Sequence, residues 1–342
     1  MEINRLVRKN ISIMKPYSSA RDEFEGENMV FFDANENPYT TEVNRYPDPY
    51  QKEVKKVIAK MKGVNTNQIL LGNGSDEVLD LLFRAFCEPK EENIVTISPS
   101  YGMYKVLANL NDVVVKEVSL EQDFTLDPDK LLEKVDDKTK IIMLCSPNNP
   151  TGNSIPFPTI LTILTKVKCL VVVDEAYIDF SEKIGLINYL NKYNQLIVIQ
   201  TLSKYYGMAG LRLGMCFSNP DIIGVLTKIK PPYNINVLTQ QKVIEQLKSN
   251  LNYYKAEVIQ EKKLLSKALH QIDFVKQVFP SDANFVLVKV TDADAVYNYL
   301  LAKKIVVRNR SKEPLCENCL RITVGTPQEN KLLIKTLMSL TI

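Results

Sequence analysis

Short apolar runs recur along the first two thirds of the chain, with amphipathic stretches between them. The runs that predict buried strands are "NQILLG", "NIVTIS", "KIIMLC", "CLVVVD" and "QLIVIQ". Residues 51–62 predict an amphipathic helix, and a second helix follows "GNGSDE", with Ser75 or Asp76 at its start. Buried strands separated by helix-length segments predict an α/β fold with a mostly parallel central sheet flanked by helices.

The pattern changes after about residue 235. A long helical stretch precedes the strand-like runs "ANFVLVKV", "IVVR" and "CLRITVG", and helical segments lie between these runs and after them. This mixture predicts a smaller α+β domain. We therefore expect an N-terminal arm over residues 1–40 that joins the small domain, a large domain over residues 41–235 and a small C-terminal domain over residues 236–342.

The unusual motifs of the chain all follow predicted strands. They are "GNGSDE", "PSYGMY", "PNNPTG", "DEAY" and "TLSKYYGMAGLRLG". In open parallel sheets, ligands bind beyond the carboxyl ends of the strands. We therefore expect the functional site at that edge of the large sheet.

Lys204 is the most distinctive residue of these motifs. It lies among hydroxyls, tyrosines and glycines, and the next charged residue after it is Arg212. Burial among such groups disfavours the ammonium form, and a neutral amine forms Schiff bases with aldehydes. A lysine that only closes a loop after a strand would give the same local pattern. This stretch alone therefore leaves the role of Lys204 open.

Composition adds limits on the partners. The chain has 342 residues, of which 45% are hydrophobic and 24% charged, and a net charge of only +3. This length allows two domains, and the charge gives no indication of nucleic-acid binding. The N-terminal residues contain no apolar core of signal-peptide length, and no apolar run is long enough to span a bilayer. We expect a cytoplasmic protein with no membrane or nucleic-acid partner.

The residue inventory also limits the chemistry. The single histidine, His270, lies in a helix-like stretch, so histidine-based triads and histidine-rich metal sites lack their residues. The only C-x-x-C motif, Cys316 to Cys319, has no second pair, and we expect no metal. The chemistry of an enzyme with this sequence would rest on lysine, carboxylates, tyrosines or a cofactor.

Pyridoxal 5'-phosphate would place several demands on such a site, and the strand ends offer a candidate for each. The pyridine nitrogen needs a carboxylate, for which Asp174 is placed 30 residues before Lys204. Asn149 and Tyr177 could bind the phenolic oxygen, and Tyr101 could stack on the ring. The phosphate needs helix-start amides, hydroxyls and an arginine, which could come from Ser75, Asp76, Thr201, Ser203 and Arg212.

These motifs carry a family resemblance. In their order and spacing, "PNNPTG", "DEAY" and "TLSK…AGLRLG" resemble the fold type I pyridoxal-phosphate aminotransferases. The segments "KPYSSARD", "ANENPY", "RYPDP", "GNGSDE", "RAFCEP", "PSYGMY" and "VVRNRSKEP…CLRITVGT" resemble the histidinol-phosphate aminotransferase family. The resemblance covers essentially the whole chain. Tyr205 and Tyr206 depart from the commoner "SKAFGLAGLR", which could alter the pocket wall.

The resemblance implies roles for the residues of the large domain, which would bind the cofactor. Lys204 would form the Schiff base and carry the proton, Asp174 would bind the pyridine nitrogen, and Asn149 and Tyr177 would bind the phenolic oxygen. Ser75, Asp76, Ser203 and Arg212 would hold the phosphate. Tyr46 would reach the phosphate in the partner subunit's site, which implies a homodimer with shared active sites.

The resemblance also implies a substrate and a reaction. Arg308 and Arg321 would bind its anionic groups, with Tyr17 and Asn284 nearby. The reaction would convert L-histidinol phosphate and 2-oxoglutarate to imidazole acetol phosphate and L-glutamate, reversibly, in histidine biosynthesis. Two alternatives remain open at this point. An aromatic or broad-range amino acid aminotransferase would share the cofactor site, and a threonine-phosphate decarboxylase would share the fold.

Overall fold

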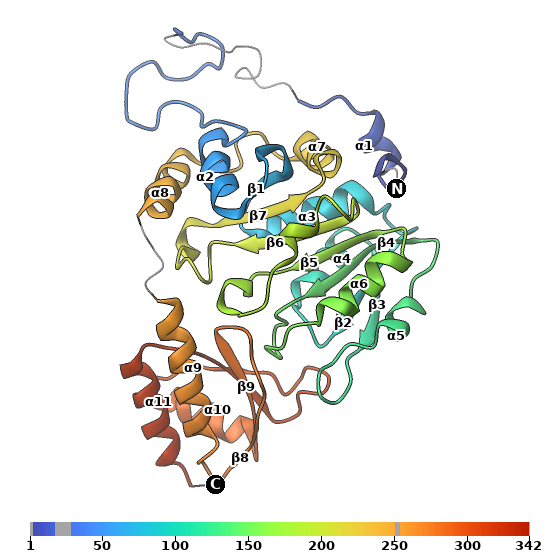
Figure 1. Ribbon diagram of the computed structural model, residues 1–342. Helices are drawn as coiled ribbons and strands as arrows, with labels where there is room; N and C mark the ends of the chain where they lie inside the picture. The colour runs from blue at the N-terminus through green and yellow to red at the C-terminus, as the bar shows by residue number, and fades with distance from the viewer. Residues whose placement is uncertain (1–2, 18–28, 250–253, 342) are drawn as a thin grey trace.

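The computed structural model describes residues 3–17, 29–249 and 254–341 (Figure 1). Its centre is a seven-stranded sheet in the order β1-β7-β6-β5-β4-β2-β3. Strand β7 is antiparallel to both of its neighbours, and the other adjacent strands are parallel. The predicted α/β fold with a mostly parallel sheet is therefore confirmed. The strands are β1 (Ile69–Asn73), β2 (Asn93–Ser98), β3 (Val114–Ser119), β4 (Thr139–Cys145), β5 (Leu170–Asp174), β6 (Leu196–Thr201) and β7 (Leu213–Ser218).

Helices cover both faces of this sheet because its central strands are apolar on both sides. In β6, Ile197 and Ile199 join the apolar cluster under α3, α4 and α7, while Leu196 and Val198 join the cluster under α2, α6 and α8. The sheet and these helices form what we call the large unit. Its α-helices are α2 (Lys52–Lys62), α3 (Ser75–Phe86), α4 (Met103–Leu110), α5 (Pro128–Leu132), α6 (Phe157–Lys166), α7 (Pro220–Ile229) and α8 (Val237–Lys248).

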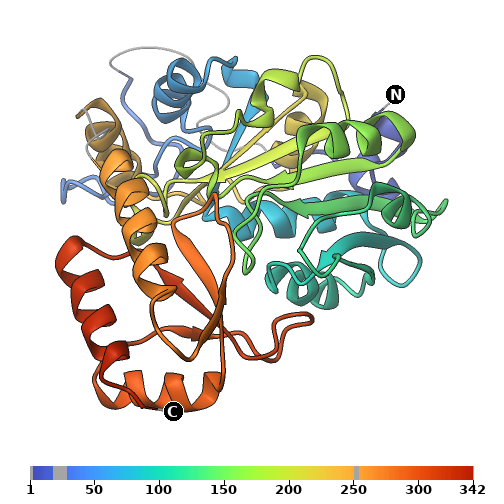
Figure 2. The same ribbon diagram turned by 60° about the horizontal axis from the view of Figure 1, so that its bottom comes forward.

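A second, antiparallel sheet lies at one end of the large unit (Figure 1). It has the order β10-β11-β9-β8, and Figure 2 shows it with its helices, in orange and red, as a separate layer beside the large unit. We call this layer the small unit. Its elements are α9 (Lys255–Leu269), β8 (Val275–Val278), β9 (Phe285–Val290), α10 (Ala293–Ala302), β10 (Arg308–Asn309), β11 (Cys319–Thr323) and α11 (Pro327–Met338).

The two faces of the small sheet pack against different partners. In β9, Val286 and Val288 pack with α9, α10 and α11, whereas Leu287 joins the core of the large unit. Arg321 of β11 is the register partner of Leu287, so its side chain lies on the same face. One face of the small sheet is therefore directed at the large unit, and this orientation brings β11 to the site described below.

The helix α8 belongs by packing to the large unit. It contacts α2, and its residue Val243 is fully buried in the core of the large unit. The structure thus places α8 with the large unit, although the sequence pattern groups it with the small domain. The predicted domain boundaries as a whole stay a prediction.

The N-terminal residues also pack on the large unit. They form η1 (Ile3–Arg5) and α1 (Lys9–Ile13), and Ile3 and Val7 are buried in the cluster under α3 and α7. Arg8 forms an ion pair with Glu88, with 3.1 Å between Nη2 and Oε1. The sequence predicted an arm that joins the small domain. In the structure, the apolar side chains of this segment are buried on α3 and α7. Residues 18–28 of that arm lie outside the described residues.

Candidate active site

The motifs that follow the strands meet at one cavity of about 140 Å³. Because the carboxyl ends of parallel strands share one edge of a sheet, residues distant in sequence converge there. Every predicted cofactor-binding residue except Tyr46 lines this cavity. Its lining consists of Ser75, Asp76, Tyr101, Cys145, Asn149, Asp174, Ala176, Tyr177, Thr201, Ser203, Lys204, Ala209 and Arg212.

Asp174 lies at the base of the cavity as the last residue of β5. Its Oδ2 accepts a hydrogen bond from the Tyr104 hydroxyl at 2.9 Å, and its Oδ1 accepts one from the Ala176 amide at 3.0 Å. Burial raises the pKa of Asp174 to about 6, against the opposing effect of these two hydrogen bonds. The carboxyl group is therefore mostly ionised at neutral pH, which suits a protonated ring nitrogen as a partner.

Lys204 lies in the turn after β6, on the same cavity as Asp174. Its Nζ is 5.8 Å from the centroid of the Tyr177 ring. Burial lowers the pKa of Lys204, and the positive charge of Arg321 adds to this effect, while Asp174 opposes it. A lowered pKa increases the fraction of neutral amine, which is the nucleophilic form.

The start of α3 lies against the loop that carries Arg212. Gly74 is the N-cap of α3 with a φ of +83°, and no side chain caps this helix. A Cβ atom on Gly74 would lie 2.5 Å from the Arg212 guanidinium, and one on Gly214 would collide with the Ser75 amide. The two glycines therefore allow the guanidinium and the helix start to converge. Free amides, a helix N-terminus and an arginine together form a site suited to a phosphate group.

Hydroxyl groups line the same part of the cavity. The Thr201 Oγ1 accepts a hydrogen bond from the Ser203 amide at 3.1 Å, which fixes the turn before Lys204. The Tyr101 hydroxyl donates to Asp76 Oδ1 at 3.1 Å. Burial raises the pKa of Tyr101, and the charge of Asp76 raises it further, so its hydroxyl stays protonated.

The small unit contacts the residues around the cavity through Arg321. Its Nη1 donates a hydrogen bond to Asn149 Oδ1, and its guanidinium carbon lies 5.3 Å from the centroid of the Phe285 ring. The Phe285 ring also packs edge-on against Tyr177, with centroids 5.1 Å apart. The Nε of Arg321 is buried and has no hydrogen-bond partner within the part of the chain that the structure describes. This guanidinium therefore has a donor available for an anion.

The other predicted substrate residues lie further from the cavity. Arg308 and Arg321 are register partners on neighbouring strands, but the Arg308 side chain is exposed. Asn284 is half-buried, and its carbonyl accepts a hydrogen bond from the Val324 amide at 2.9 Å. Tyr17 is 71% exposed. The substrate roles of these residues stay predictions.

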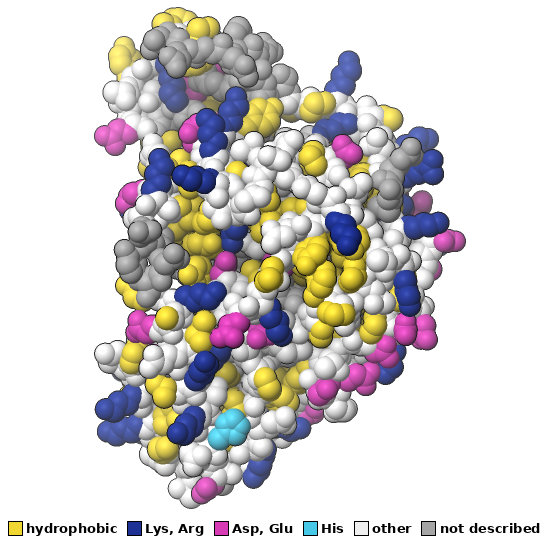
Figure 3. Space-filling view, viewed as in Figure 1, with side chains coloured by type: hydrophobic (Ala, Val, Ile, Leu, Met, Phe, Trp, Pro, Cys, Tyr) yellow, Lys and Arg dark blue, Asp and Glu magenta, His cyan; other side chains and the backbone are white. Residues whose placement is uncertain are grey.

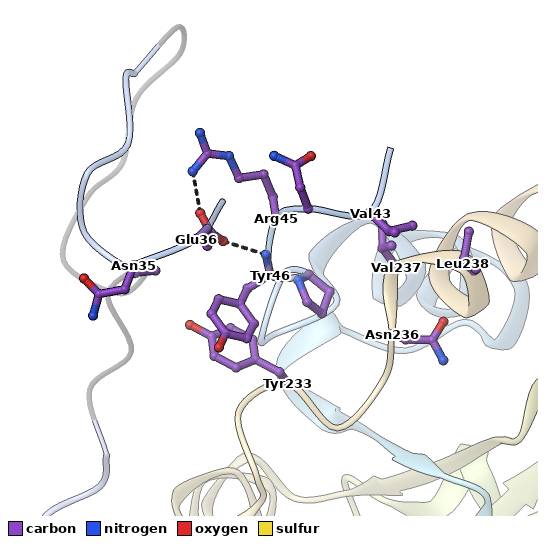
Figure 4. A pocket seen from close by; sticks show the side chains of 12 residues that line it. Asn35, Glu36, Val43, Arg45, Tyr46, Tyr233, Asn236, Val237 and Leu238 are labelled. Atoms are coloured by element: carbon purple, nitrogen blue, oxygen red, sulfur yellow. Dashed lines mark hydrogen bonds and ion pairs between the residues drawn. The ribbon is translucent and has the colours of Figure 1, made fainter. Parts of the chain in front are cut away.

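Tyr46 occupies a different pocket of about 490 Å³ (Figure 4). Its ring stacks on Tyr233, with centroids 4.4 Å apart and an angle of 15° between the planes. Its backbone amide donates to the Glu36 carboxylate at 2.6 Å, and Arg45 pairs with the same carboxylate at 2.7 Å. Within one chain, Tyr46 does not line the cavity that contains Lys204.

The sequence interpretation missed two residues at the site. Tyr104 is fully buried and bonded to Asp174, and its signal was its place one helical turn after Tyr101 in "PSYGMY". Arg310 lies two residues after Arg308, so it shares the strand face. The charge of Arg310 contributes to the lowered pKa of Arg321, after the larger effect of burial.

The residues described include no group of three or more histidines, cysteines or acids arranged to hold a metal ion. Across the described ranges, no helix is both long and apolar enough to cross a bilayer.

Residues 33–337 match the family model described as "Aminotransferase class I and II". The chain belongs to this family. This aminotransferase is 54% identical to the histidinol-phosphate aminotransferase of Flavobacterium johnsoniae over 341 residues, which cover 98% of both chains. Its fold is similar to the crystal structure of the histidinol-phosphate aminotransferase from Clostridium acetobutylicum, at a TM-score of 0.79 and 26% identity, covering 86% of this chain and 90% of that one.

A second solved structure supports the same fold for this aminotransferase. It is the histidinol-phosphate aminotransferase from Sinorhizobium meliloti in complex with pyridoxal-5'-phosphate. The TM-score is 0.80 at 24% identity, covering 87% of this chain and 83% of that one. The predicted fold type I resemblance is therefore confirmed for the chain as a whole.

Proposed function

We propose that this aminotransferase converts L-histidinol phosphate and 2-oxoglutarate to imidazole acetol phosphate and L-glutamate, reversibly, in histidine biosynthesis. The observation that carries the proposal is the near-complete match, at 54% identity, to a relative of that name. The cavity supports it independently, because a nucleophilic lysine, a buried carboxylate and a phosphate-binding corner line the same space.

The cavity residues fit pyridoxal 5'-phosphate as the cofactor. Lys204 offers an amine to its aldehyde, Asp174 offers a carboxylate to its ring nitrogen, and the start of α3 with Arg212 offers donors to its phosphate. Asn149 and Tyr177 line the same cavity and would donate to its phenolic oxygen, beside the ring of Tyr101. When bound, this cofactor supplies an electron-accepting ring that makes the Cα–H bond of an attached amine acidic.

The side chains of the chain then have distinct tasks. Lys204 would hold the cofactor at rest, give way to the amine of the substrate, and move the proton from Cα. Its lowered pKa favours both tasks, since each needs a neutral amine. Asp174 would keep a positive charge on the ring nitrogen, and its own hydrogen bonds to Tyr104 and Ala176 hold it in place.

The anionic end of the substrate would meet Arg321. Its buried Nε has no partner among the described residues, so an incoming phosphate would satisfy a donor that is otherwise costly to leave buried. Arg308, on the neighbouring strand, would add positive charge, and Asn284 and Tyr17 would complete the substrate contacts. An arginine pair suits a doubly charged anion better than a single carboxylate.

We also propose a cytoplasmic homodimer with shared active sites, in which Tyr46 reaches the phosphate in the partner's site. Large apolar side chains are exposed around the Tyr46 pocket, and a second copy of the chain would cover them. They are Val43, Tyr46 and Leu238. The six cysteines are all free thiols, which favours a reducing compartment.

A paired assay tests the reaction. The purified protein is incubated with 2-oxoglutarate and either histidinol phosphate or phenylalanine, and glutamate is measured. We expect much faster glutamate formation with histidinol phosphate. Faster formation with phenylalanine would favour the aromatic or broad-range enzyme. Carbon dioxide release from threonine phosphate, without glutamate formation, would favour the decarboxylase.

A further inference from the structure

The turn between β8 and β9 joins the two units through a single acid, Asp282. Its backbone amide donates to the Gly152 carbonyl at 2.8 Å. Its Oδ2 accepts a hydrogen bond from the Ser154 amide at 3.2 Å and pairs with Lys183 Nζ at 2.8 Å. Gly152, Ser154 and Lys183 all belong to the large unit. One residue of the small unit therefore binds two separate loops of the large one.

The turn fits closely against the large unit. Gly152 has a φ of +86°, and a Cβ atom on it would lie 2.8 Å from the Ser281 Cβ. On the other side of the turn, Lys262 of α9 donates to the Ser281 carbonyl at 2.7 Å and to the Ala283 carbonyl at 2.8 Å. The turn is thus fixed within the small unit by α9 and to the large unit by Asp282.

The loop that Asp282 binds is the one that carries Asn149. The Gly152 amide donates to the Asn148 carbonyl at 2.7 Å, and the Asn148 amide to the Asn153 carbonyl at 2.8 Å, so the loop is tight. Asn149 lines the cavity and accepts the hydrogen bond from Arg321. Two contacts therefore fix the small sheet on this loop, Arg321 at one end and Asp282 at the other.

The turn also continues directly into residues of the site. Asn284 follows Asp282 by two residues, and Phe285 packs on Tyr177 and under the Arg321 guanidinium. A movement of Asp282 would consequently displace both Asn284 and the ring that supports Arg321. Burial acts to raise the pKa of Asp282, but hydrogen bonds from Lys183 and Ser154 outweigh it and hold the pKa below its ordinary value.

We propose that Asp282 is a positioning residue. It holds the small sheet against the Asn149 loop and thereby sets the placement of Asn284 and Arg321 for the substrate. This role rests on the proposed function, because the substrate is the one that Arg321 would bind. Asp282 itself touches no reacting atom.

The two contacts of the Asp282 carboxylate differ in solvent exposure, and this difference determines which one contributes more to positioning the small sheet. The contacts of Asp282 lie beside a groove of about 800 Å³, which Lys183, Lys262 and Asp282 help to line. Figure 3 shows basic and acidic side chains gathered where the two units meet. The Lys183 side chain is 55% exposed, so solvent screens its charge. The hydrogen bond to the Ser154 amide is better shielded, and we expect it to carry more of the effect.

Three substitutions separate these contacts. Asp282→Ala removes both, Asp282→Asn keeps an oxygen for the Ser154 amide, and Lys183→Gln removes only the charge. We expect a roughly ten- to hundredfold loss of kcat/KM for histidinol phosphate in Asp282→Ala, mainly through KM, and at most about a fivefold loss in the other two. Glu182→Gln, which removes another acid of the same groove, is the matched control and should behave as wild type.

Two further measurements distinguish positioning from general destabilisation. Amide hydrogen exchange in Asp282→Ala should accelerate in residues 148–154 and 279–290 and stay unchanged in α3. Cofactor retention on dialysis should also stay unchanged. Unaltered exchange in both segments, or an equal loss of activity in Asp282→Ala and Asp282→Asn, would overturn the proposal. If Asp282→Ala does not fold, Asp282→Ser, which also loses the carboxylate, is measured in its place, and unaltered exchange in both segments of that variant overturns the proposal.

The same experiment separates this proposal from the proposed function. A wild-type enzyme that does not use histidinol phosphate overturns the proposed function. The amide hydrogen exchange of residues 148–154 and 279–290 still decides whether Asp282 joins these two segments.

Discussion

The cofactor end of the site and its substrate end are built differently. At the cofactor end, Asp174 and Tyr177 are buried, and Lys204 lies beside them on the same short stretch of sheet edge. At the substrate end, Tyr17 and Arg308 are exposed, and only Arg321 reaches the cavity loop. One chain therefore preorganises most of the cofactor end, to which, as we propose, a second copy adds Tyr46, whereas the substrate end depends on contacts between the two units.

Lys204→Ala should have the largest effect, because no other cavity residue is an amine. We expect no transamination and no visible absorbance from a covalently held cofactor. The residues that bind its phosphate would still hold the cofactor. Absorbance that survives borohydride treatment and dialysis would show that another lysine holds the cofactor. Lys230 is the matched control, since burial lowers its pKa to about 8 and it lies outside the cavity. Lys230→Gln should keep the absorbance.

Tyr46→Ala tests whether the cofactor end needs a second chain. We expect it to lose most of its activity as a homodimer, because the partner's site would lack one phosphate contact. Mixing it with Lys204→Ala should restore part of the activity, since one site of each mixed dimer has both residues intact. The measurement is activity against mixing ratio after demonstrated subunit exchange. Normal activity of Tyr46→Ala alone, or no recovery on mixing, would contradict a shared site.

Substitutions of Arg321 and Arg308 compare a half-buried cation with an exposed one on paired strands. Removing a buried charged partner typically costs about 2–5 kcal/mol, so Arg321→Ala should lower kcat/KM for histidinol phosphate by roughly two orders of magnitude or more. Arg308→Ala should cost less, because solvent screens its charge, and should spare a neutral aromatic amino acid. An equal loss of both substrates in Arg308→Ala would show that this arginine does not recognise the phosphate.

Tyr104→Phe should have the smallest effect and a distinct signature. The Tyr104 hydroxyl lowers the pKa of Asp174, which is about 6, so removing it should raise that pKa. Less of the carboxylate would then be ionised below neutral pH, and the acid limb of the kcat profile should move to higher pH. We expect a loss of about tenfold near pH 6 that disappears as the pH rises. An unshifted acid limb would contradict this role.

The sequence predicted the cofactor end because its residues follow apolar strands that are recognisable locally. Asp174 ends one such run and Lys204 follows the end of another, and topology alone then brings them together. Tyr104 was missed because an aromatic residue at helical spacing has the pattern of an ordinary core residue. Its hydrogen bond to Asp174 depends on how α4 packs, which no local pattern contains.

The first and last segments of the large unit, the N-terminal residues and α8, could not be placed from the sequence in the same way. Ile3 and Val7 form a short apolar pattern that fits several surfaces, and only the packing shows that it is buried on α3 and α7. The helix α8 has a weakly amphipathic sequence, and its burial through Val243 is likewise a result of tertiary structure. The roles of Tyr46 and Tyr17 stay predictions, because Tyr46 lies outside the cavity and Tyr17 is exposed.

The buried thiols give a way to time the opening of each unit separately. The chain has no tryptophan to report unfolding by fluorescence, but all six cysteines are free and buried. Cys87, Cys145, Cys169 and Cys216 lie in the large unit, and Cys316 and Cys319 lie in the small one. A thiol-alkylating reagent can modify the five that do not line the cavity, all but Cys145, only after the surrounding structure opens. Peptide mass spectrometry gives the alkylation rate of each cysteine. Comparing the rates of the two units therefore shows whether the small sheet detaches before the large one unfolds.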